Sequence, residues 1–277
     1  MDENTTEILE EINNETDELY ISEMEIEGTL NLKKFKKLTY LDCGYNCIKK
    51  LSSLGKEIIE LNCENNLISS LNILPKKLKK LHCGKNLIKK LENLPCELLE
   101  LNCGGNKILK LDNLPPKLKK LDCDQNHLKT LDNLPKSLEF LNCNANYIKK
   151  LDNLPCGLIE LNCGSTLITS LDYLPESLEF LICSDNDIKN LYNLPNGLKI
   201  LDCSCTNIIK ICNLPKKLLN LICSFCYINE IYDLPESLKT LECSNNYYLD
   251  MNAIIIPKKI KKITSYNCGK YITINSH

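Results

Sequence analysis

The chain has 277 residues, 43% of them hydrophobic and 25% charged, with a formal net charge of −2. This composition is close to the globular average, which excludes a disordered chain and a collagen. No stretch approaches the roughly 20 consecutive apolar residues that a bilayer crossing needs, so we expect no membrane span. The charge is uneven: residues 1–27 hold 11 acids and no lysine, whereas the rest holds 34 lysines against 25 acids. The sequence therefore predicts an acidic arm before a basic globular body.

Residues 1–30 are predicted to form an acidic N-terminal capping segment. Ile8, Leu9, Ile12 and Leu19 recur at near-helical spacing, which predicts a short capping helix over residues 5–19. The segment lacks the basic and apolar stretches of a secretory signal. The 18 cysteines are also too sparse for a small disulfide scaffold, so we expect free thiols and a reducing, cytoplasmic location.

A repeat of 20 residues fills the second predicted region, residues 31–277. One unit, residues 78–97, reads LKKLHCGKNLIKKLENLPCE. Cysteine keeps its place in eleven successive units. This cysteine column consists of Cys43, Cys63, Cys83, Cys103, Cys123, Cys143, Cys163, Cys183, Cys203, Cys223 and Cys243. Proline recurs with the same period near the end of most units, which excludes a long helix.

Each unit is predicted to form one flattened coil of a solenoid. Leu81 and Cys83 alternate around His82, which indicates a short strand with the leucine and cysteine inward. The apolar residues that follow turn the chain back beneath this strand. A single coil cannot bury its own leucines, so about twelve coils are expected to stack, with their strands in one parallel sheet.

The pattern LxxLxCxxNxIxxLxxLPxxL resembles the leucine-rich repeat, with cysteine in place of one strand leucine. The repeat length and the LP pair are similar to those of bacterial effector proteins, and the LPxSL variants to repeats of protist and giant-virus proteins. The resemblance covers about residues 38–263. It implies an α/β-class horseshoe with a parallel sheet on the concave face and an extended or 3₁₀ convex side. It also implies a non-catalytic module that binds another protein, of a host cell if the source is a virus.

In that family the asparagine of the pattern forms a buried ladder that bonds to backbone groups of adjacent turns. The resemblance implies such a ladder beside the cysteine column. Its members are Asn46, Asn66, Asn86, Asn106, Asn126, Asn146, Asn186 and Asn246. Thr166, Thr206 and Cys226 replace asparagine but keep a donor, so we expect a locally looser ladder. Cys268 takes the asparagine place of an irregular twelfth coil.

We expect the cysteine column to be structural, because free cysteine behaves as a small buried hydrophobe. Disulfides along it are disfavoured, since neighbouring strands lie about 4.8 Å apart and a bridge needs Cβ atoms about 3.8 Å apart. The alternative is a zinc site of Cys203, Cys205, Cys223 and Cys226. Because Cys203 and Cys223 belong to the cysteine column and Cys226 stands at the asparagine position of its repeat, we expect no metal.

No catalytic motif accompanies the repeats. His82, His127 and His277 are the histidines, and the first two occupy different repeat positions. The sequence holds no glycine-rich phosphate loop, HExxH motif or nucleophile elbow. We expect neither an enzyme nor a cofactor.

The strand residues three places and one place before each cysteine are predicted to face outward. Six apolar residues at or beside these places are predicted to bind a partner. They are Phe140, Phe180, Ile182, Ile200, Ile222 and Phe225. Apolar clusters rimmed by polar groups mark interaction sites, although scattered surface apolar residues are common.

Two other functions stay open. Lysine pairs along the coil edges would suit a polyanion-binding scaffold, but a solvated face explains them as well, and the lack of arginine argues against nucleic acid. The chain could also be a substrate adaptor for a ubiquitin ligase, although the residues before the first coil are too few for an F-box-like domain. A further possibility is that the acidic arm, residues 1–27, folds against the basic body and screens its charge.

Overall fold

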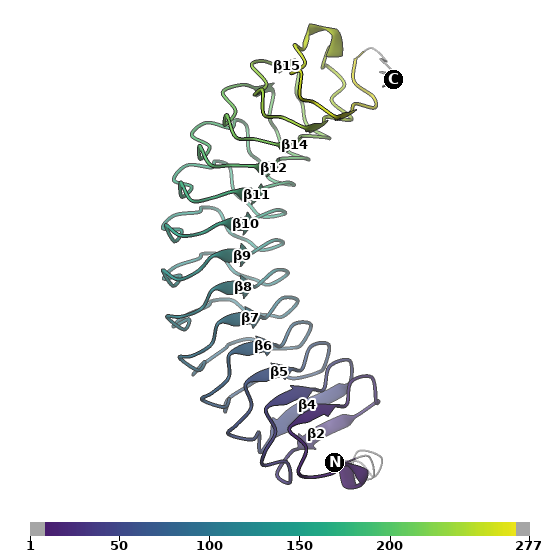
Figure 1. Cartoon of the computed structure of the whole chain (residues 1–277), viewed down its shortest axis with the longest axis vertical. Coiled ribbons are helices and arrows are strands. Elements are labelled where there is room, and N and C mark those ends of the chain that lie inside the picture. Colours follow the sequence, from purple (N-terminus) through teal and green to yellow (C-terminus); the bar gives the residue numbers. More distant parts are fainter. Residues whose placement is uncertain (1–8, 270–277) are drawn as a thin grey trace. The chain divides into compact units, whose positions relative to one another are not determined.

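The structure is a computed structural model that describes residues 9–269, in two units, Met1–Asn142 and Cys143–His277. Each unit is a stack of flattened coils (Figure 1), and each coil contributes one short strand to a parallel sheet. This confirms the predicted solenoid. The described part of the chain contains no helix with the length and hydrophobicity of a membrane-spanning segment.

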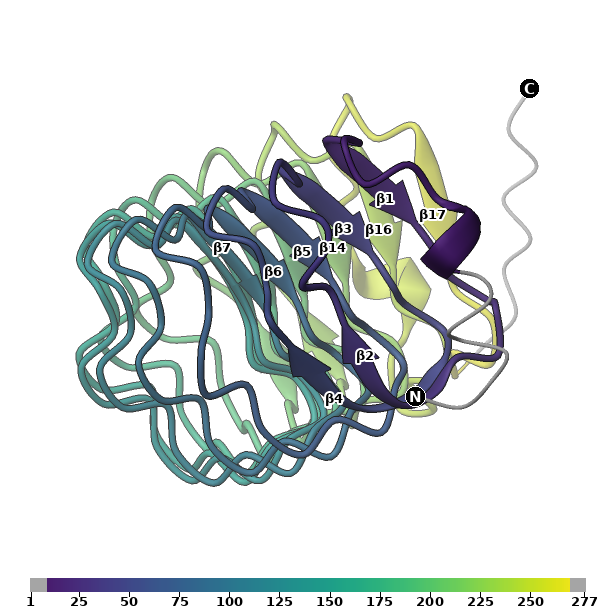
Figure 2. The ribbon, with the colours of Figure 1, turned by 90° about the horizontal axis from the view of Figure 1, so that it is seen from below.

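The first unit has a parallel sheet and a small second sheet. The strands of the parallel sheet follow in chain order: β1 (Glu18–Tyr20), β3 (Tyr40–Asp42), β5 (Glu60–Asn62), β6 (Lys80–His82), β7 (Glu100–Asn102), β8 (Lys120–Asp122) and β9 (Phe140–Asn142). On another side of the coils, β2 (Glu27–Asn31) pairs in parallel with β4 (Cys47–Ser52) (Figure 2).

The second unit repeats this arrangement. The strands of its parallel sheet are β10 (Glu160–Asn162), β11 (Phe180–Ile182), β12 (Ile200–Asp202), β14 (Asn220–Ile222), β16 (Thr240–Glu242) and β17 (Lys262–Thr264). The strands β13 (Lys210–Ile211) and β15 (Glu230–Ile231) form a separate parallel pair. A 3₁₀ turn, η1 (Met251–Ala253), precedes β17, which completes the irregular last coil as predicted.

The core lies inside the coils and is built from the same places of every repeat. Leu81, Cys83 and Ile88 are fully buried, and so are their counterparts in the neighbouring coils. Strands pair in register, so that Leu61, Leu81 and Leu101 stack on one another. Because burial of an aliphatic side chain is worth about 1.5–3 kcal/mol, stacking supplies the stability that one coil lacks.

Each coil turns through backbone conformations that the sequence pattern alone did not reveal. The asparagine before the Leu-Pro pair has a positive φ, as at Asn93 (56°) and Asn153 (60°). Asparagine tolerates this left-handed conformation better than most residues. The NLP motif is therefore a turn signal. Ile73 occupies the same place but does not adopt a positive φ, as expected for a β-branched residue.

The N-terminal segment differs from its prediction. Residues 9–11 are helical, but residues 18–20 form β1, which pairs with β3 and places Leu19 in the core. The predicted helix over residues 5–19 is therefore wrong beyond residue 11, and residues 5–8 lie outside the described range. Leu19 and Ile21 alternate around Tyr20 as Leu41 and Cys43 alternate around Asp42, so the strand pattern begins inside the 1–30 segment.

Candidate protein-interaction surface

The ladder asparagines use their side chains inside the fold. The Asn66 amide nitrogen donates to the carbonyls of Cys43 (3.0 Å) and Cys63 (3.2 Å), and its oxygen accepts from Ile48 N (2.9 Å). Asn86 and Asn106 make the same set of bonds. Each therefore ties its own coil to the preceding coil.

The ladder continues through its three replacements with fewer or longer bonds. Thr166 Oγ1 donates to Cys163 O (2.9 Å) and to Asn186 Oδ1 (2.8 Å). The bond from Ile168 N to Asn186 Oδ1 lengthens to 3.3 Å, against 2.9 Å at Asn66. Cys226 reaches Cys203 O at 3.4 Å through its thiol. Thr166 thus bonds to the next coil while the neighbouring Ile168 bond lengthens, and Cys226 bonds to the preceding coil at a longer distance than asparagine does.

The thiols of the cysteine column are hydrogen-bonded and have low reactivity. The Cys163 and Cys183 thiols each donate to a backbone carbonyl of the next coil at 3.4 Å. Burial raises the pKa of the Cys63 thiol to about 12. Because the thiolate is the reactive and metal-binding form, these sulfurs are poor nucleophiles and poor ligands at neutral pH.

Among the described residues, the cysteines and histidines considered above for a zinc site or for catalysis do not come together in one group. Cys203 and Cys223 are buried in the core, whereas Cys205 is exposed. Within residues 9–269, no three His, Cys, Asp or Glu side chains form a group that could hold a metal ion. His82 Nε2 lies 3.9 Å from Glu100 Oε1 on the outer face of the sheet, and His277 lies outside the described residues.

The residue one place before the column cysteine has a structural role that the sequence analysis missed. Asp42 Oδ1 accepts from Gly44 N, and Asp202 Oδ1 accepts from Ser204 N, both at 3.0 Å. Asparagine makes the same turn bond at Asn62, Asn102 and Asn162. Asp and Asn at this place therefore close the strand exit.

In the first unit, the outer face of the sheet is mostly polar, with aromatic residues at its two ends, Tyr20 and Tyr40 on β1 and β3 and Phe140 on β9. Lys80 Nζ lies 3.1 Å from Glu60 Oε1 on the neighbouring strand. The Asp124 carboxylate lies over Gly104, where a Cβ atom would meet its Oδ1 at 1.9 Å. Its burial, together with the neighbouring Asp122 charge, raises the pKa of Asp124 to about 6. Between these aromatic residues, β5 to β8 present charged and polar side chains and no apolar one.

A few lysines of the predicted basic stripes, such as Lys77 and Lys119, form ion pairs, and so do some lysines outside the stripes. Lysines at several coil edges pair with a glutamate of an adjacent coil at 2.5–2.9 Å. These pairs are Lys77–Glu57, Lys117–Glu97, Lys119–Glu139, Lys199–Glu179 and Lys210–Glu230. The pairs lower the local positive potential at these five lysines.

In the second unit, the outer face of the sheet is partly apolar. Phe180, Ile182, Ile200 and Ile222 lie on β11, β12 and β14 and are partly exposed; we call them the strand patch. Phe180 stands in register with Ile200, whereas Asp202 separates Ile182 from Ile222.

The two remaining predicted partner residues lie outside this patch. Phe225 is 61% exposed on the turn after β14, with a positive φ of 57°. Phe140 is at the start of β9 and belongs to the first unit. The structure thus groups four of the six predicted residues on one sheet face.

Solved structures share this fold. YopM from Yersinia enterocolitica is 31% identical over 83% of this chain and 55% of that chain, with a TM-score of 0.74. The functional domain of InlJ from Listeria monocytogenes, which is described as including a cysteine ladder, is 25% identical over 83% of this chain and 63% of that chain (TM-score 0.58). The internalin InlF from the same organism is 18% identical over 94% of this chain and 93% of that chain (TM-score 0.72), and at this identity it shows the fold alone.

The chain spans less than two thirds of the length of the YopM and InlJ structures. No protein-family model matches the sequence, and no curated protein matches it.

Proposed function

Because the chain is a leucine-rich-repeat protein built from 20-residue repeats, we propose that it binds another protein through the strand patch of its second unit. Stacked repeats offer extended surfaces for recognition, and the ladder and the column use their polar groups internally. The outer side chains are the ones left to select a partner.

The observation that carries this proposal is the presence of isoleucine where the fold favours Asp or Asn. Ile182 and Ile222 occupy the turn-closing place and cannot accept the hydrogen bond that Asp202 accepts between them. The fold alone gives no reason for isoleucine there. Binding to a partner gives such a reason, because it would remove this apolar surface from water and stabilise the complex by about 25 cal/mol per Å² of surface buried.

The lack of arginine, together with the ion pairs at some edge lysines, makes polyanion binding the weaker function. Surface pairs contribute little to stability, but they cancel charge locally. A polyanion complex would also weaken steeply with salt.

Phe180→Glu is expected to abolish capture of the partner without unfolding the chain. The neighbouring strand already carries Glu160 at this repeat place, so the sheet accepts an acid there. The immobilised chain and the variant would be compared by quantitative mass spectrometry of proteins captured from a lysate of the source or host cell. The partner is identified as a captured protein that stays bound at high salt and whose captured amount falls at least about tenfold on Phe180→Glu.

Lys120→Glu is the matched control, because it introduces the same residue at the same repeat place in the first unit. It should leave capture unchanged, and far-ultraviolet circular dichroism should show both variants folded. Equal capture by wild type and Phe180→Glu would contradict the proposal. A loss of all captured protein at high salt would favour the polyanion function instead.

A further inference from the structure

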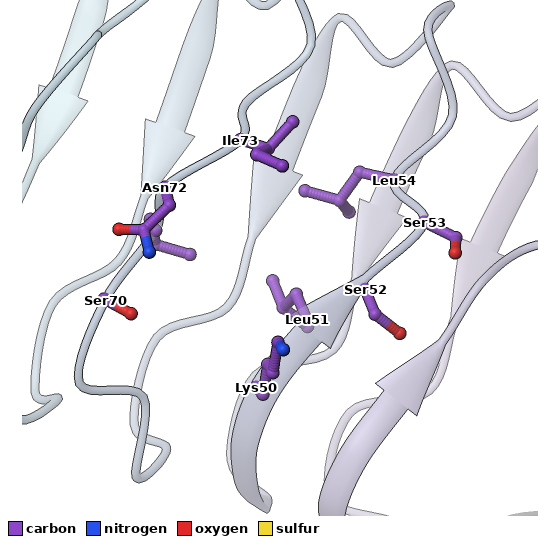
Figure 3. A pocket seen from close by; sticks show the side chains of 9 residues that line it. Lys50, Leu51, Ser52, Ser53, Leu54, Ser70, Asn72 and Ile73 are labelled. Atoms are coloured by element: carbon purple, nitrogen blue, oxygen red, sulfur yellow. The ribbon is translucent and has the colours of Figure 1, made fainter.

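The first and last strands of the parallel sheet each have one edge without a described partner. Among the described strands, β1 pairs with β3 alone and β17 pairs with β16 alone. Figure 2 views the first coil from its end, and no described segment crosses in front of β1. By contrast, the hollow between residues 50–54 and 70–73 (Figure 3) has counterparts at the same place of other coils in both units. The two ends therefore offer surfaces that the other coils do not repeat.

Strand β17 directs two backbone groups away from β16 that are paired in the coil before it. In that coil, the Lys239 carbonyl accepts from Lys261 N at 2.7 Å. The Cys243 N–H donates to Thr264 O at 2.8 Å. The groups at the same places of the last coil are Lys261 O and Ser265 N, and no described residue bonds to either. The last coil therefore presents a carbonyl and an N–H to a further parallel strand.

The last coil also leaves part of its core uncovered. Ile260 and Ile263 are half-buried. At the same places of the coil before it, Leu238 and Leu241 are 0% and 1% exposed. Each coil of a solenoid buries its core against its neighbours, so an end coil has one uncovered side. A further strand beside β17 would remove this apolar surface from water.

The two ends carry opposite charges at the same three repeat places. The last coil has lysine there: Lys259, Lys261 and Lys262. The first coil has acids there: Glu15, Asp17 and Glu18, with Glu18 and Lys262 each at the start of its strand. Residues 251–269 contain no acid, and residues 1–27 contain no lysine. None of the three lysines forms an ion pair with a described residue. Unlike ends therefore attract each other, whereas two like ends repel.

Adjacent coils within the chain already pair at these three places. The pairs are Lys77–Glu57 at the first place, Lys199–Glu179 at the second and Lys80–Glu60 at the third, with 2.5–3.1 Å between nitrogen and oxygen. Glu15 also pairs with Lys37 at 2.5 Å, so a lysine on its other side would extend the alternation of lysine and glutamate along the first place. An acidic strand beside β17 repeats a contact that this sheet uses. A second β17 does not, because edge lysines oppose the pairing of like edges.

We propose that β17 of one copy of the chain takes β1 of a second copy as its neighbour, so that the parallel sheet continues from copy to copy. The register sets Lys262 beside Glu18 of the second copy, which repeats the pairs within the chain. The Lys261 carbonyl then accepts from Glu18 N. The Ser265 N–H donates to Tyr20 O of the second copy, to which no described residue bonds. The contact joins two different surfaces, so a third copy can add in the same way. It uses none of the strand-patch residues and is independent of the proposed function.

Sedimentation velocity of the full chain tests the contact. At about 0.1 mM protein and about 50 mM salt, species larger than the 31.6 kDa monomer are expected, and they should diminish as salt is added. Lys261→Glu with Lys262→Glu should weaken the association at least about tenfold. Lys216→Glu with Lys217→Glu is the matched control, because it reverses two exposed lysines of an inner coil. It should leave the association unchanged.

A charge exchange separates this contact from a general attraction between acidic and basic surfaces. Asp17→Lys with Glu18→Lys should also prevent association, because both ends of that variant are basic. An equimolar mixture of this variant with Lys261→Glu/Lys262→Glu should restore it, since each variant then carries an end that complements the other. Circular dichroism should show all variants folded.

Four results would each overturn the proposal. The first is a monomer at every concentration up to about 1 mM, which is also the outcome if the chain's own residues cover β17. The second is full association of the Lys261→Glu/Lys262→Glu variant or of the Asp17→Lys/Glu18→Lys variant alone. The third is an equal effect of the control, and the fourth is a mixture that stays monomeric.

Discussion

Raising the pH from 7 to about 10 is expected to unfold the protein, because the column thiols can ionise only in the unfolded chain. Burial raises the pKa of Cys63 from an ordinary value of 9 to about 12. Seven other fully buried column thiols shift in the same direction: Cys43, Cys83, Cys103, Cys163, Cys183, Cys203 and Cys223.

The sign follows from proton linkage. Above pH 9 the unfolded chain loses thiol protons that the folded chain keeps, so the free energy of unfolding falls as the pH rises. Each thiol lowers it by about 1 kcal/mol per pH unit. Eight thiols together lower it on the order of 10 kcal/mol at pH 10, which is comparable with the whole stability of an ordinary domain. Denaturant unfolding followed by circular dichroism at pH 7, 9 and 10 measures this loss.

A pair of double variants separates the column from other alkaline groups. Cys63→Ala with Cys183→Ala removes two buried thiols and should reduce the pH dependence by about a quarter. Cys96→Ala with Cys156→Ala removes two exposed thiols and should leave it unchanged. The same pH dependence in both double variants would contradict the assignment.

Asn106→Leu is expected to lower the free energy of unfolding by about 4 kcal/mol. Asn106 is 6% exposed and donates to the carbonyls of Cys83 and Cys103, both at 3.0 Å. Its oxygen accepts from Ile88 N at 2.9 Å. Leucine has a similar size but leaves these backbone groups buried and unpaired, at a cost of about 1–3 kcal/mol each. Chemical denaturation at neutral pH measures the difference.

The chain itself offers the intermediate substitution. Asn106→Thr copies the natural residue at Thr206, whose hydroxyl donates to the carbonyl of its own coil at 2.7 Å. It should cost about half as much as leucine, because the bond within the coil survives. Asn190→Leu, at an exposed site, should stay within about 0.5 kcal/mol of wild type. Equal stability of all three variants would show that the ladder contributes nothing.

The repeat made most of the fold predictable. Leucine and cysteine recur at fixed places, so the strand, its inward face and the in-register stacking follow from residues such as Leu81 and Cys83. The prediction was wrong at residues 12–19, where the spacing of Ile8, Leu9, Ile12 and Leu19 suggested a continuous helix. There the pairing of Leu19 with Leu41 decided the structure, and such long-range pairing is not visible in local periodicity.

The candidate surfaces were less predictable. The outward places of Phe180 and Ile200 followed from the period of two along a strand. The turn-closing role of Asp42 and Asp202 did not, because it depends on a side chain reaching the backbone two residues later.

Native-state thiol labelling, resolved residue by residue by mass spectrometry, tests most directly whether the coils share one closed interior. At neutral pH, Cys47, Cys96, Cys156 and Cys205 are expected to react with a small alkylating reagent, and the column cysteines to react only after denaturant is added. Labelling of Cys83 or Cys183 in the native protein at the rate of Cys96 would contradict the stacked core.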